Sequence, residues 1–431
     1  MSNEAAETPN STTDSNSDAA ADAGESAAQE YPLLTLRDGL PGVTDTDAGL
    51  VEAATAIAAG TGPVSVDAER ASGYRYSNRA YLIQLRREGS GTWLIDPIGL
   101  STLEPLAEAL DGTEWILHAA TQDLPCLAEV GLRPTALFDT ELAGRLLGYP
   151  RVGLATLVET VLGFHLKKEH SAADWSTRPL PESWLEYAAL DVEVLVELRA
   201  ALVEELDASG KAEWARQEFE ALRSFEFTPR AEGWRRTSGM HRIRGRRELA
   251  LVRALWEARD QIAQQRDVTP GRIIPDSAIV AAATAMPADR TTLLGTPGFR
   301  GRGAERYASR WVAAIKEALA LSDADLPGRN PRGESGPPPP RAWAEKDPVA
   351  AQRLTLARDA VAKLAEEKNV PQENLLTPDY LRRVMWTPPD TRDPGMLLDD
   401  VAAQLTGYGA RGWQIALVAP LLVDAILGAT A

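Results

Sequence analysis

The sequence of 431 residues contains one cysteine, Cys126, and only four histidines. A single cysteine cannot form an internal disulfide, which is typical of proteins in a reducing cytosol. These few residues also offer no Cys/His cluster for a structural zinc ion. No apolar run approaches the roughly 20 residues that span a bilayer, because the segment 417–427 is short and contains Pro420. The N-terminus lacks the basic start and apolar run of a signal peptide. We therefore expect a cytoplasmic protein without a membrane partner.

Basic residues are outnumbered: 45 Lys and Arg face 62 Asp and Glu, and the formal net charge is −17. Such an excess of negative charge, taken alone, argues against nucleic-acid binding. The distribution is uneven, however. Residues 1–30 contain seven acidic and no basic residues, whereas 230–247 contain seven arginines and one glutamate. Because salt screens charges beyond about 10 Å, local clusters decide where a polyanion binds. Nucleic acid therefore stays open as a partner.

Composition divides the chain into segments. Residues 1–30 have no aromatic side chain and too little apolar surface to fold, so we expect a disordered acidic tail. Strand and helix patterns then alternate, and only helical periodicity follows. Proline and glycine mark a linker at 323–347. The predicted domains are an α/β domain at 31–227, an arginine-rich linker at 228–241, and all-helical domains at 242–322 and 348–431.

The α/β domain is predicted to contain three successive strands at 64–66, 81–85 and 93–95, and a fourth at 115–118. Neighbouring strands followed by helix–strand alternation indicate a mixed sheet flanked by helices on both faces. Helical spacing is found at 103–110, 124–130, 143–147, 154–162, 181–206 and 212–225.

The two helical segments resemble copies of one another. Ala258-Arg259-Asp260 matches Ala357-Arg358-Asp359, and Ile274 corresponds to Leu376. The offset of about one hundred residues is too long for a solenoid repeat. It indicates a tandem domain duplication.

Two carboxylates, Asp67 and Glu69, follow the alternating residues Val64 and Val66. Residues i and i+2 of a strand point to the same face. Two anions on one face repel each other and lose hydration when enclosed, and a divalent cation removes both penalties. A D-x-E pair by itself is more often a solvated strand end, so other residues must decide.

Further candidates lie downstream. Asp123 stands where a loop becomes a helix, and it could be an N-cap, a metal ligand or both. Tyr187 and Asp191 are four residues apart on the predicted helix 181–206, so their side chains share a face.

In this order, the three motifs resemble those of the DEDD exonucleases of the tyrosine type. The histidine type carries histidine five residues before the last aspartate, where this chain has Glu186. Flanking residues make residues 31–205 similar to the ribonuclease D family, and both helical segments resemble the HRDC domain, the second more distantly. These flanking residues are His118-Ala119-Ala120, Gln122-Asp123-Leu124, Phe138-Asp139-Thr140 and Asp174-Trp175-Ser176-Thr177-Arg178-Pro179-Leu180.

The resemblance implies a ribonuclease H-like α/β exonuclease domain followed by two all-α HRDC-type domains. It implies a 3′-to-5′ exoribonuclease that releases nucleoside 5′-monophosphates from single-stranded 3′ ends of RNA, including tRNA precursors. The carboxylates would bind two Mg²⁺ or Mn²⁺ ions, which prefer oxygen ligands and can assist an in-line displacement. The tyrosine, with an ordinary pKa of about 10, is a poor base and would orient the attacking water. The catalytic residues carried over are Asp67, Glu69, Asp123, Tyr187 and Asp191.

Two alternatives remain open at this point. One is a DNA 3′–5′ exonuclease of the Werner type, because only contacts to the 2′-hydroxyl would separate RNA from DNA. The other is a non-catalytic RNA-binding scaffold, against which the intact carboxylate set speaks. The sequence does not fix the oligomeric state, for which a monomer is the expectation.

Substrate contacts are expected from side chains near the carboxylates and from the helical domains. The arginines of 230–247 and of the first helical domain would grip long RNA, although acidic residues in both helical domains also allow a protein-binding role. All catalytic candidates lie before residue 206, so we expect the chemistry to be independent of residues 229–431. The candidate substrate contacts near the site are Tyr76, Arg79, Lys167, Lys168 and Arg178.

Overall fold

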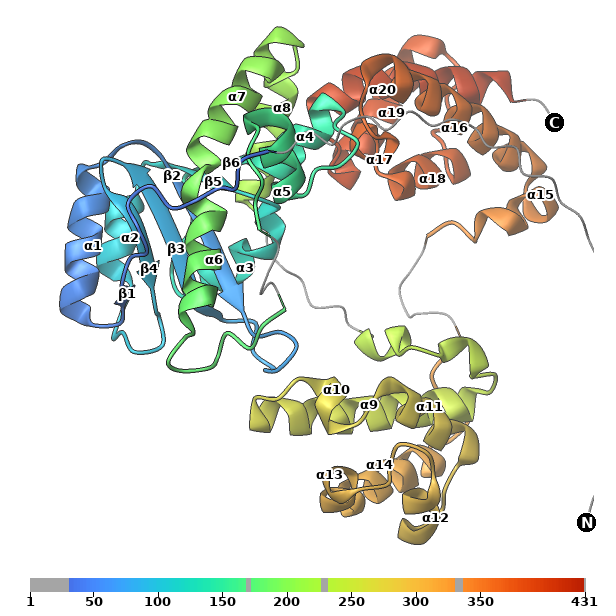
Figure 1. Ribbon diagram of the computed structural model, residues 1–431. Coiled ribbons are helices and arrows are strands. Elements are labelled where there is room, and N and C mark those ends of the chain that lie inside the picture. The colour runs from blue at the N-terminus through green and yellow to red at the C-terminus, as the bar shows by residue number, and fades with distance from the viewer. Residues whose placement is uncertain (1–30, 168–171, 226–231, 330–335, 430–431) are drawn as a thin grey trace, which may run out of the picture.

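The structure of the chain is a computed structural model. It describes residues 31–167, 172–225, 232–329 and 336–429. The acidic tail at 1–30 and Lys168 lie outside these ranges. Figure 1 shows an α/β domain in blue and green, followed by two helical units, the first yellow and the second orange to red. We call residues 232–329 the first helical unit and residues 336–429 the second.

A six-stranded mixed sheet forms the centre of the α/β domain, with the strand order β1-β4-β3-β2-β5-β6. The pairs β2–β3 and β3–β4 are antiparallel, whereas β1–β4, β2–β5 and β5–β6 are parallel. The predicted mixed sheet is confirmed, and the strand that carries the D-x-E pair lies inside it. The strands are β1 Val43–Thr44, β2 Thr61–Arg70, β3 Ala80–Glu88, β4 Gly91–Ile95, β5 Glu114–Leu117 and β6 Ala136–Asp139.

Helices cover both faces of this sheet. Along β3, Leu82 packs in a cluster with Ala188 and Ala189, whereas Ile83 and Leu85 belong to the main core. Because side chains alternate along a strand, these two groups occupy opposite faces. The helices of the domain are α1 Asp47–Ala59, α2 Glu104–Leu110, α3 Leu124–Glu129, α4 Thr140–Leu147, α5 Leu154–Leu157, α6 Glu182–Glu193, α7 Leu195–Ala208 and α8 Ala212–Arg223, with a π-helical turn Val158–Leu162 after α5.

Several elements differ from the predicted ones. The sequence patterns missed β1, α1 and β6, and the single predicted helix 181–206 is broken at Val194 into α6 and α7. Strands β1 and β6 have two and four residues, which is too short for alternation to be detected. Helix α1 is rich in alanine, which blurs the contrast between its buried and exposed faces.

The two helical units contain only helices in their described parts. The first consists of 3-10 turns Gly233–Arg236 and Met240–Arg242 and helices α9 Arg246–Arg266, α10 Pro270–Ile273, α11 Asp276–Ala285, α12 Arg290–Gly295, α13 Arg302–Arg306 and α14 Ala308–Ala320. The second consists of a 3-10 turn Pro340–Ala342 and helices α15 Trp343–Lys346, α16 Pro348–Lys368, α17 Gln372–Leu375, α18 Pro378–Trp386, α19 Pro394–Tyr408 and α20 Gly412–Gly428. No helix in the described ranges is long and apolar enough to cross a membrane.

The two units repeat the same succession of helices. Helices α9 and α16 both have 21 residues, and the bounds of α16 and α17 lie 102 positions after those of α9 and α10. Ile274 and Leu376 are equivalent in this register, as predicted. The match of Arg259 to Arg358 is wrong, because helices of equal length leave no room for a shift, and Arg259 corresponds to Val361, which is also buried.

The hydrophobic cores do not follow the domain boundaries predicted from the sequence. The first helical unit has a core of its own, in which Trp234 and Trp311 are buried. The second unit shares one continuous core with the α/β domain. At their junction, the rings of Trp214 and Trp413 stack with centroids 4.7 Å apart, and Trp413 Nε1 donates to Glu218 at 2.9 Å.

This shared core argues against the expectation that the chemistry is independent of residues 229–431. A chain that ended after α8 would expose Trp214 and the carboxylate of Glu218, which is 8% exposed in the intact protein. The α/β domain therefore depends on the second helical unit for its packing, even though the catalytic candidates lie before residue 206.

Three arginines of the 230–247 segment, Arg235, Arg246 and Arg247, are used inside the first helical unit. Arg235 binds Glu232 and the carbonyl of Gly328, and its guanidinium carbon lies 4.2 Å from the ring centroid of Trp234. Arg246 donates to the carbonyl of Leu326. Arg247 donates to the carbonyl of Leu321 and pairs with Asp323. These side chains connect the first part of the unit to residues 321–328 near its end. They are therefore poor candidates for binding RNA.

Candidate active site

Two carboxylates project from the end of β2. Asp67 pairs with Gln84 and Glu69 with Leu82 across the antiparallel ladder, so both point to the same face of the sheet. Glu69 keeps 9% of its surface exposed. The ladder shifts register between Glu69 and Arg70, and the strand ends there.

Helix α6 brings two further side chains to this point. Tyr187 and Asp191 lie one turn apart, and the Tyr187 hydroxyl donates a hydrogen bond to the Asp191 carboxylate. One carboxylate oxygen from each of Asp67, Glu69 and Asp191 falls within a group whose members all lie within 4.8 Å of one another. At least 118 residues separate the two carboxylates of β2 from Tyr187 and Asp191 in sequence, so only the fold brings them together.

Asp123 lines the same pocket from the start of α3. Its side chain caps no backbone amide of α3, so the simple N-cap interpretation does not hold. A guanidinium nitrogen of Arg70 lies 3.7 Å from Asp123 Oδ1. Asp123 stands outside the 4.8 Å group of the other three carboxylates. The pocket, of about 250 Å³, thus contains all five predicted catalytic residues.

Asp139 holds the turn that presents Asp123. It accepts hydrogen bonds from the amides of Ala119 and Ala120 at 3.1 and 2.8 Å, and it also caps α4. Ala119 has a positive φ of 58°, a conformation that costs an alanine energy. The four amides bound by one buried carboxylate stabilise that conformation.

Burial and mutual repulsion raise the pKa values of the clustered carboxyls. Burial, with the charges of Asp67, Asp191 and Asp123, raises the pKa of Glu69 well above its ordinary value. Burial and the charge of Asp67 do the same to the pKa of Asp123 and of Asp191. Burial also raises the pKa of Asp67, against the opposing effects of the Ala68 amide and Arg70. Enclosed, crowded oxygen donors that resist ionisation are what a hard divalent cation stabilises, so the residues fit such an ion.

His118 is a pocket residue that the sequence reasoning did not select. Its Nδ1 lies 2.9 Å from Thr140 Oγ1, and burial lowers the pKa of its imidazole to about 4. The ring is therefore neutral at physiological pH. Its place in the His118-Ala119-Ala120 motif was the available signal, because that motif leads directly into the turn before Asp123.

The other candidate contacts have partners within the protein. The Tyr76 hydroxyl donates to Asp260 at 3.0 Å, and Arg79 lies over the ring of Tyr81 at 5.7 Å. Arg178 binds the carboxylate of Asp96 and the carbonyl of Tyr81, which favours a structural role over contact with RNA. Lys167 is exposed, and Lys168 lies outside the described residues.

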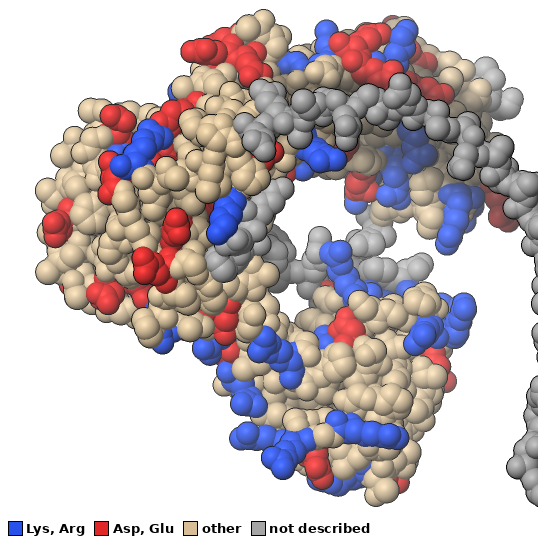
Figure 2. Space-filling model, viewed as in Figure 1, with Lys and Arg blue, Asp and Glu red and all other residues tan. Residues whose placement is uncertain are grey.

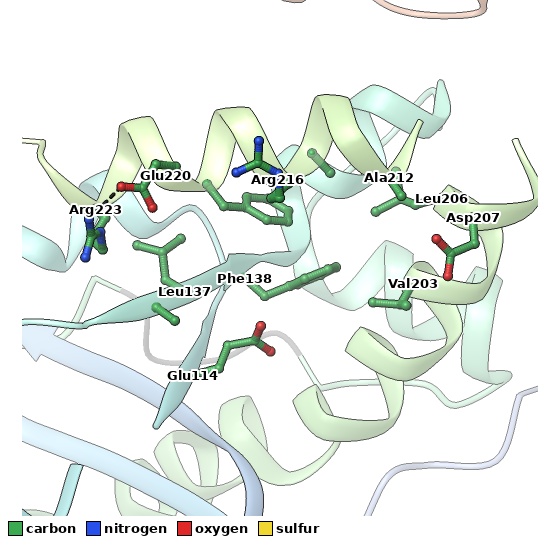
Figure 3. A pocket seen from close by; sticks show the side chains of 13 residues that line it. Glu114, Leu137, Phe138, Val203, Leu206, Asp207, Ala212, Arg216, Glu220 and Arg223 are labelled. Carbon is green, nitrogen blue, oxygen red and sulfur yellow. Dashed lines mark hydrogen bonds and ion pairs between the residues drawn. The ribbon is translucent and has the colours of Figure 1, made fainter. Parts of the chain in front are cut away.

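A second pocket, shown in Figure 3, lies between β6 and the helices α7 and α8. Its lining is mainly apolar, and the rings of Phe138 and Phe219 are 4.7 Å apart. Two of its charged residues, Glu220 and Arg223, pair with each other. It offers no clustered carboxylates, so the pocket at the end of β2 is the better candidate for catalysis.

Comparison with known proteins identifies the family of each domain. Family models match residues 43–207 as a 3′-5′ exonuclease, 248–315 as an HRDC domain and 336–426 as a 3′ to 5′ exonuclease C-terminal domain. A ribonuclease D from Gluconacetobacter diazotrophicus is 31% identical over 333 residues, which cover 75% of this chain and 81% of the relative. The chain belongs to the ribonuclease D family. The ribonuclease D of Escherichia coli K12 is 30% identical over 303 residues, which cover 69% of this chain and 77% of the relative.

Solved structures share the whole architecture. A protein from Bifidobacterium adolescentis is 38% identical with a TM-score of 0.83, and the match covers 92% of this chain and all of that one. The structure of E. coli RNase D matches with a TM-score of 0.67 at 24% identity and covers 90% of this chain and 99% of that one. The expected family and fold are thus confirmed, and the chain is a 3′–5′ exoribonuclease whose α/β part is the exonuclease domain.

Proposed function

We propose that the chain shortens RNA from the 3′ end by hydrolysis and releases nucleoside 5′-monophosphates, with two divalent ions held by Asp67, Glu69, Asp123 and Asp191. The observation that carries this proposal is the group of carboxylate oxygens of Asp67, Glu69 and Asp191 within 4.8 Å. Asp123 lines the same pocket and completes a set of four negative charges. Such a set matches two divalent cations in charge and in ligand type.

The bound ions would supply Lewis-acid activation of water and charge stabilisation at the departing 3′-oxygen. The chain's own residues determine where these ions and the scissile phosphate lie. Glu69 and Asp67 are fixed by the ladder to β3, and Asp191 is fixed by α6, which packs on β2, β3 and β4. The four carboxylates therefore come from three separate elements that the core holds together.

Tyr187 is proposed to orient the attacking water. Burial, with the charges of Asp191 and Glu69, raises the pKa of its hydroxyl above the ordinary value. The hydroxyl therefore remains protonated and cannot act as a base, but it can donate or accept a hydrogen bond at a fixed position. Its bond to Asp191 places it beside the proposed ligands.

Structured RNAs, including tRNA precursors, are the proposed substrates. The E. coli RNase D that shares the fold is described as an exoribonuclease involved in structured RNA processing. Longer substrates would be gripped by the first helical unit, over which Figure 2 shows Lys and Arg side chains gathered at the bottom of the view. Exposed cations near α13 that are candidates for phosphate contact are Arg300, Arg302 and Arg306.

The test uses the purified full chain with 5′-labelled RNA and DNA of equal sequence, in Mg²⁺, in Mn²⁺ or in chelator. We expect stepwise shortening of RNA, mononucleotide products and no cleavage in chelator. Faster cleavage of DNA than of RNA would favour the Werner-type function. RNA binding without cleavage of either polymer in either metal would favour the scaffold.

A further inference from the structure

The loop 71–79 connects the carboxylate strand β2 to β3 and begins two residues after Glu69. Two of its residues, Tyr76 and Arg79, were candidate substrate contacts in the sequence. In the structure, this loop is instead the surface on which the first helical unit docks. The docking brings residues 260–272 against a segment 184 to 199 positions earlier in the chain.

Asp267 is the centre of this contact. Its Oδ1 accepts hydrogen bonds from the backbone amides of Tyr76 at 3.2 Å and Ser77 at 3.0 Å. Its Oδ2 lies 3.9 Å from a guanidinium nitrogen of Arg75. Asp267 ends α9 with a positive φ of 46°, so the backbone turns sharply there and directs the carboxylate out of the helix end. One side chain thus binds two consecutive amides of the loop.

Neighbouring residues extend the contact along the loop. The Thr269 amide donates to the carbonyl of Tyr74 at 3.0 Å. Arg272 Nε donates to the carbonyl of Gly73 at 3.1 Å, and its guanidinium carbon lies 4.2 Å from the ring centroid of Tyr74. Backbone groups of the loop are therefore held from the helical unit at four positions, Gly73, Tyr74, Tyr76 and Ser77.

On its other side, the loop contacts residues that pack around helix α6, which carries Tyr187. Tyr74 packs against the cluster that contains Trp175, Ala188 and Ala189, and Tyr187 packs against the same cluster. The rings of Trp175 and Tyr187 are 6.4 Å apart. Arg75 Nε donates to Ser176 Oγ at 2.8 Å, next to Trp175. The loop therefore lies between the helical unit and the side chains that pack around Tyr187.

We propose that Asp267 is a positioning residue for the exonuclease reaction: by fixing the amides of Tyr76 and Ser77, it makes the docked first helical unit part of the wall that places Tyr187. This inference rests on the proposed role of Tyr187. It predicts that the first unit affects the chemical step on substrates too short to touch the helical units, which a role in gripping RNA alone does not.

The second helical unit provides a matched control. Asn369 ends α16 with a φ of 49°, at the position equivalent to Asp267, and its Nδ2 donates to the carbonyl of Leu147 at 3.0 Å. This contact lies at the end of α4 rather than beside the catalytic pocket. Glycine tolerates the left-handed conformation at either position. Asp267→Gly and Asn369→Gly therefore each remove one docking side chain without straining the helix end.

The experiment measures kcat and KM on a four-nucleotide RNA for the wild-type chain, Asp267→Gly, Asp267→Asn and Asn369→Gly. We expect Asp267→Gly to lower kcat by at least about tenfold with KM within about twofold, as for misplacement of a catalytic group. Asp267→Asn keeps an acceptor oxygen and should restore kcat to near the wild-type value. Asn369→Gly should match the wild type. The ratio of variant to wild type tests this inference, whereas the wild-type rate itself tests the proposed function.

Hydrogen exchange gives a readout that does not depend on activity. In Asp267→Gly, exchange should accelerate in 71–79 and also in the α6 segment around Tyr187, and Arg272→Met should show the same pattern more weakly. Equal kcat in Asp267→Gly and the wild type would overturn the inference. So would faster exchange confined to 71–79, or an equal fall in kcat in Asn369→Gly.

Discussion

Asp267 and Asn369 end the longest helices of their units in the same left-handed conformation, and each binds the exonuclease domain from that position. The Asp267 side chain accepts from amides of the loop after β2, whereas the Asn369 side chain donates to the carbonyl of Leu147 and the Asn369 backbone carbonyl accepts from Lys211 Nζ at 3.1 Å. The two helical units thus dock through equivalent helix ends, but at two different places on the exonuclease domain. Asp267 presents a side-chain acceptor to backbone amides, whereas Asn369 presents a side-chain donor to a backbone carbonyl.

Neutralising a carboxylate of the pocket should abolish catalysis and stabilise the metal-free fold. We expect Asp67→Asn or Asp191→Asn to lower single-turnover RNA cleavage by at least about a hundredfold, because each removes a charged ligand. Without metal, the melting temperature should rise, because one source of repulsion is gone; a gain of about 1 kcal/mol corresponds to roughly 2–4 °C. Glu52→Gln, on the exposed face of α1, is the control and should change neither quantity. Cleavage within about tenfold of wild type in either variant would remove the basis for the proposed metal site.

Tyr187 and Asp123 should differ in their effect on metal binding. Tyr187→Phe removes only the hydroxyl that is proposed to orient water, so cleavage should slow substantially while the Mn²⁺ concentration for half-maximal rate stays nearly constant. Asp123→Asn removes a charge from the pocket and should raise that concentration as well. Titration of Mn²⁺ against the cleavage rate for both variants measures the difference. Equal weakening of metal binding in the two would give Tyr187 a different role.

The metal-free protein should lose stability as the pH rises. The pKa values of Asp67, Glu69, Asp123 and Asp191 are raised in the folded state, so the folded protein binds these protons more tightly than the unfolded chain. The contribution of these four carboxyls to the free energy of unfolding is then fully present below their ordinary pKa of about 4 and is lost as the pH rises through the raised pKa values. Melting temperatures between about pH 5 and pH 8 should therefore decrease in chelator. Saturating Mn²⁺ should flatten this decrease, and parallel curves with and without Mn²⁺ would contradict the prediction.

Exposed arginines of the first helical unit should control the salt dependence of RNA binding. Replacement of Arg300, Arg302 and Arg306 by glutamine should weaken binding to a tRNA-sized RNA and reduce the slope of log affinity against log salt by about 0.7 per lost contact. A charge-matched control replaces the exposed Lys346, Lys363 and Lys368 of the second unit. Affinity and slope equal to those of the wild type in the arginine variant would leave the protein-binding role for the unit.

Local spacing made part of the candidate site predictable. Asp67 and Glu69 share a face because a strand alternates, and Tyr187 and Asp191 share a face because a helix turns in about 3.6 residues. Each relation links residues only two or four positions apart, so it can be inferred from the sequence without knowledge of the fold. The mixed sheet followed from the order of strands and helices for the same reason.

Contacts between distant segments were not predictable in this way. Tyr76 and Arg178 looked like substrate contacts because their chemistry suits RNA, yet Asp260 and Asp96 occupy them in the fold. The same is true of Arg246 and Arg247, which bind carbonyls about 75–80 positions later. A basic side chain has the same appearance in the sequence whether its anion belongs to a ligand or to the protein, because partner choice is decided by tertiary packing.

The continuous core between the exonuclease domain and the second helical unit sets a limit on how this protein can vary. Elements that share one core unfold together, whereas a unit with its own core and a polar docking surface can open separately. During evolution, loss or replacement of the first helical unit would leave this continuous core intact but would remove the contacts of Asp267 with the loop 71–79. Loss of the second would uncover Trp214 and the apolar face around it. The second helical unit is thus harder to lose than the first.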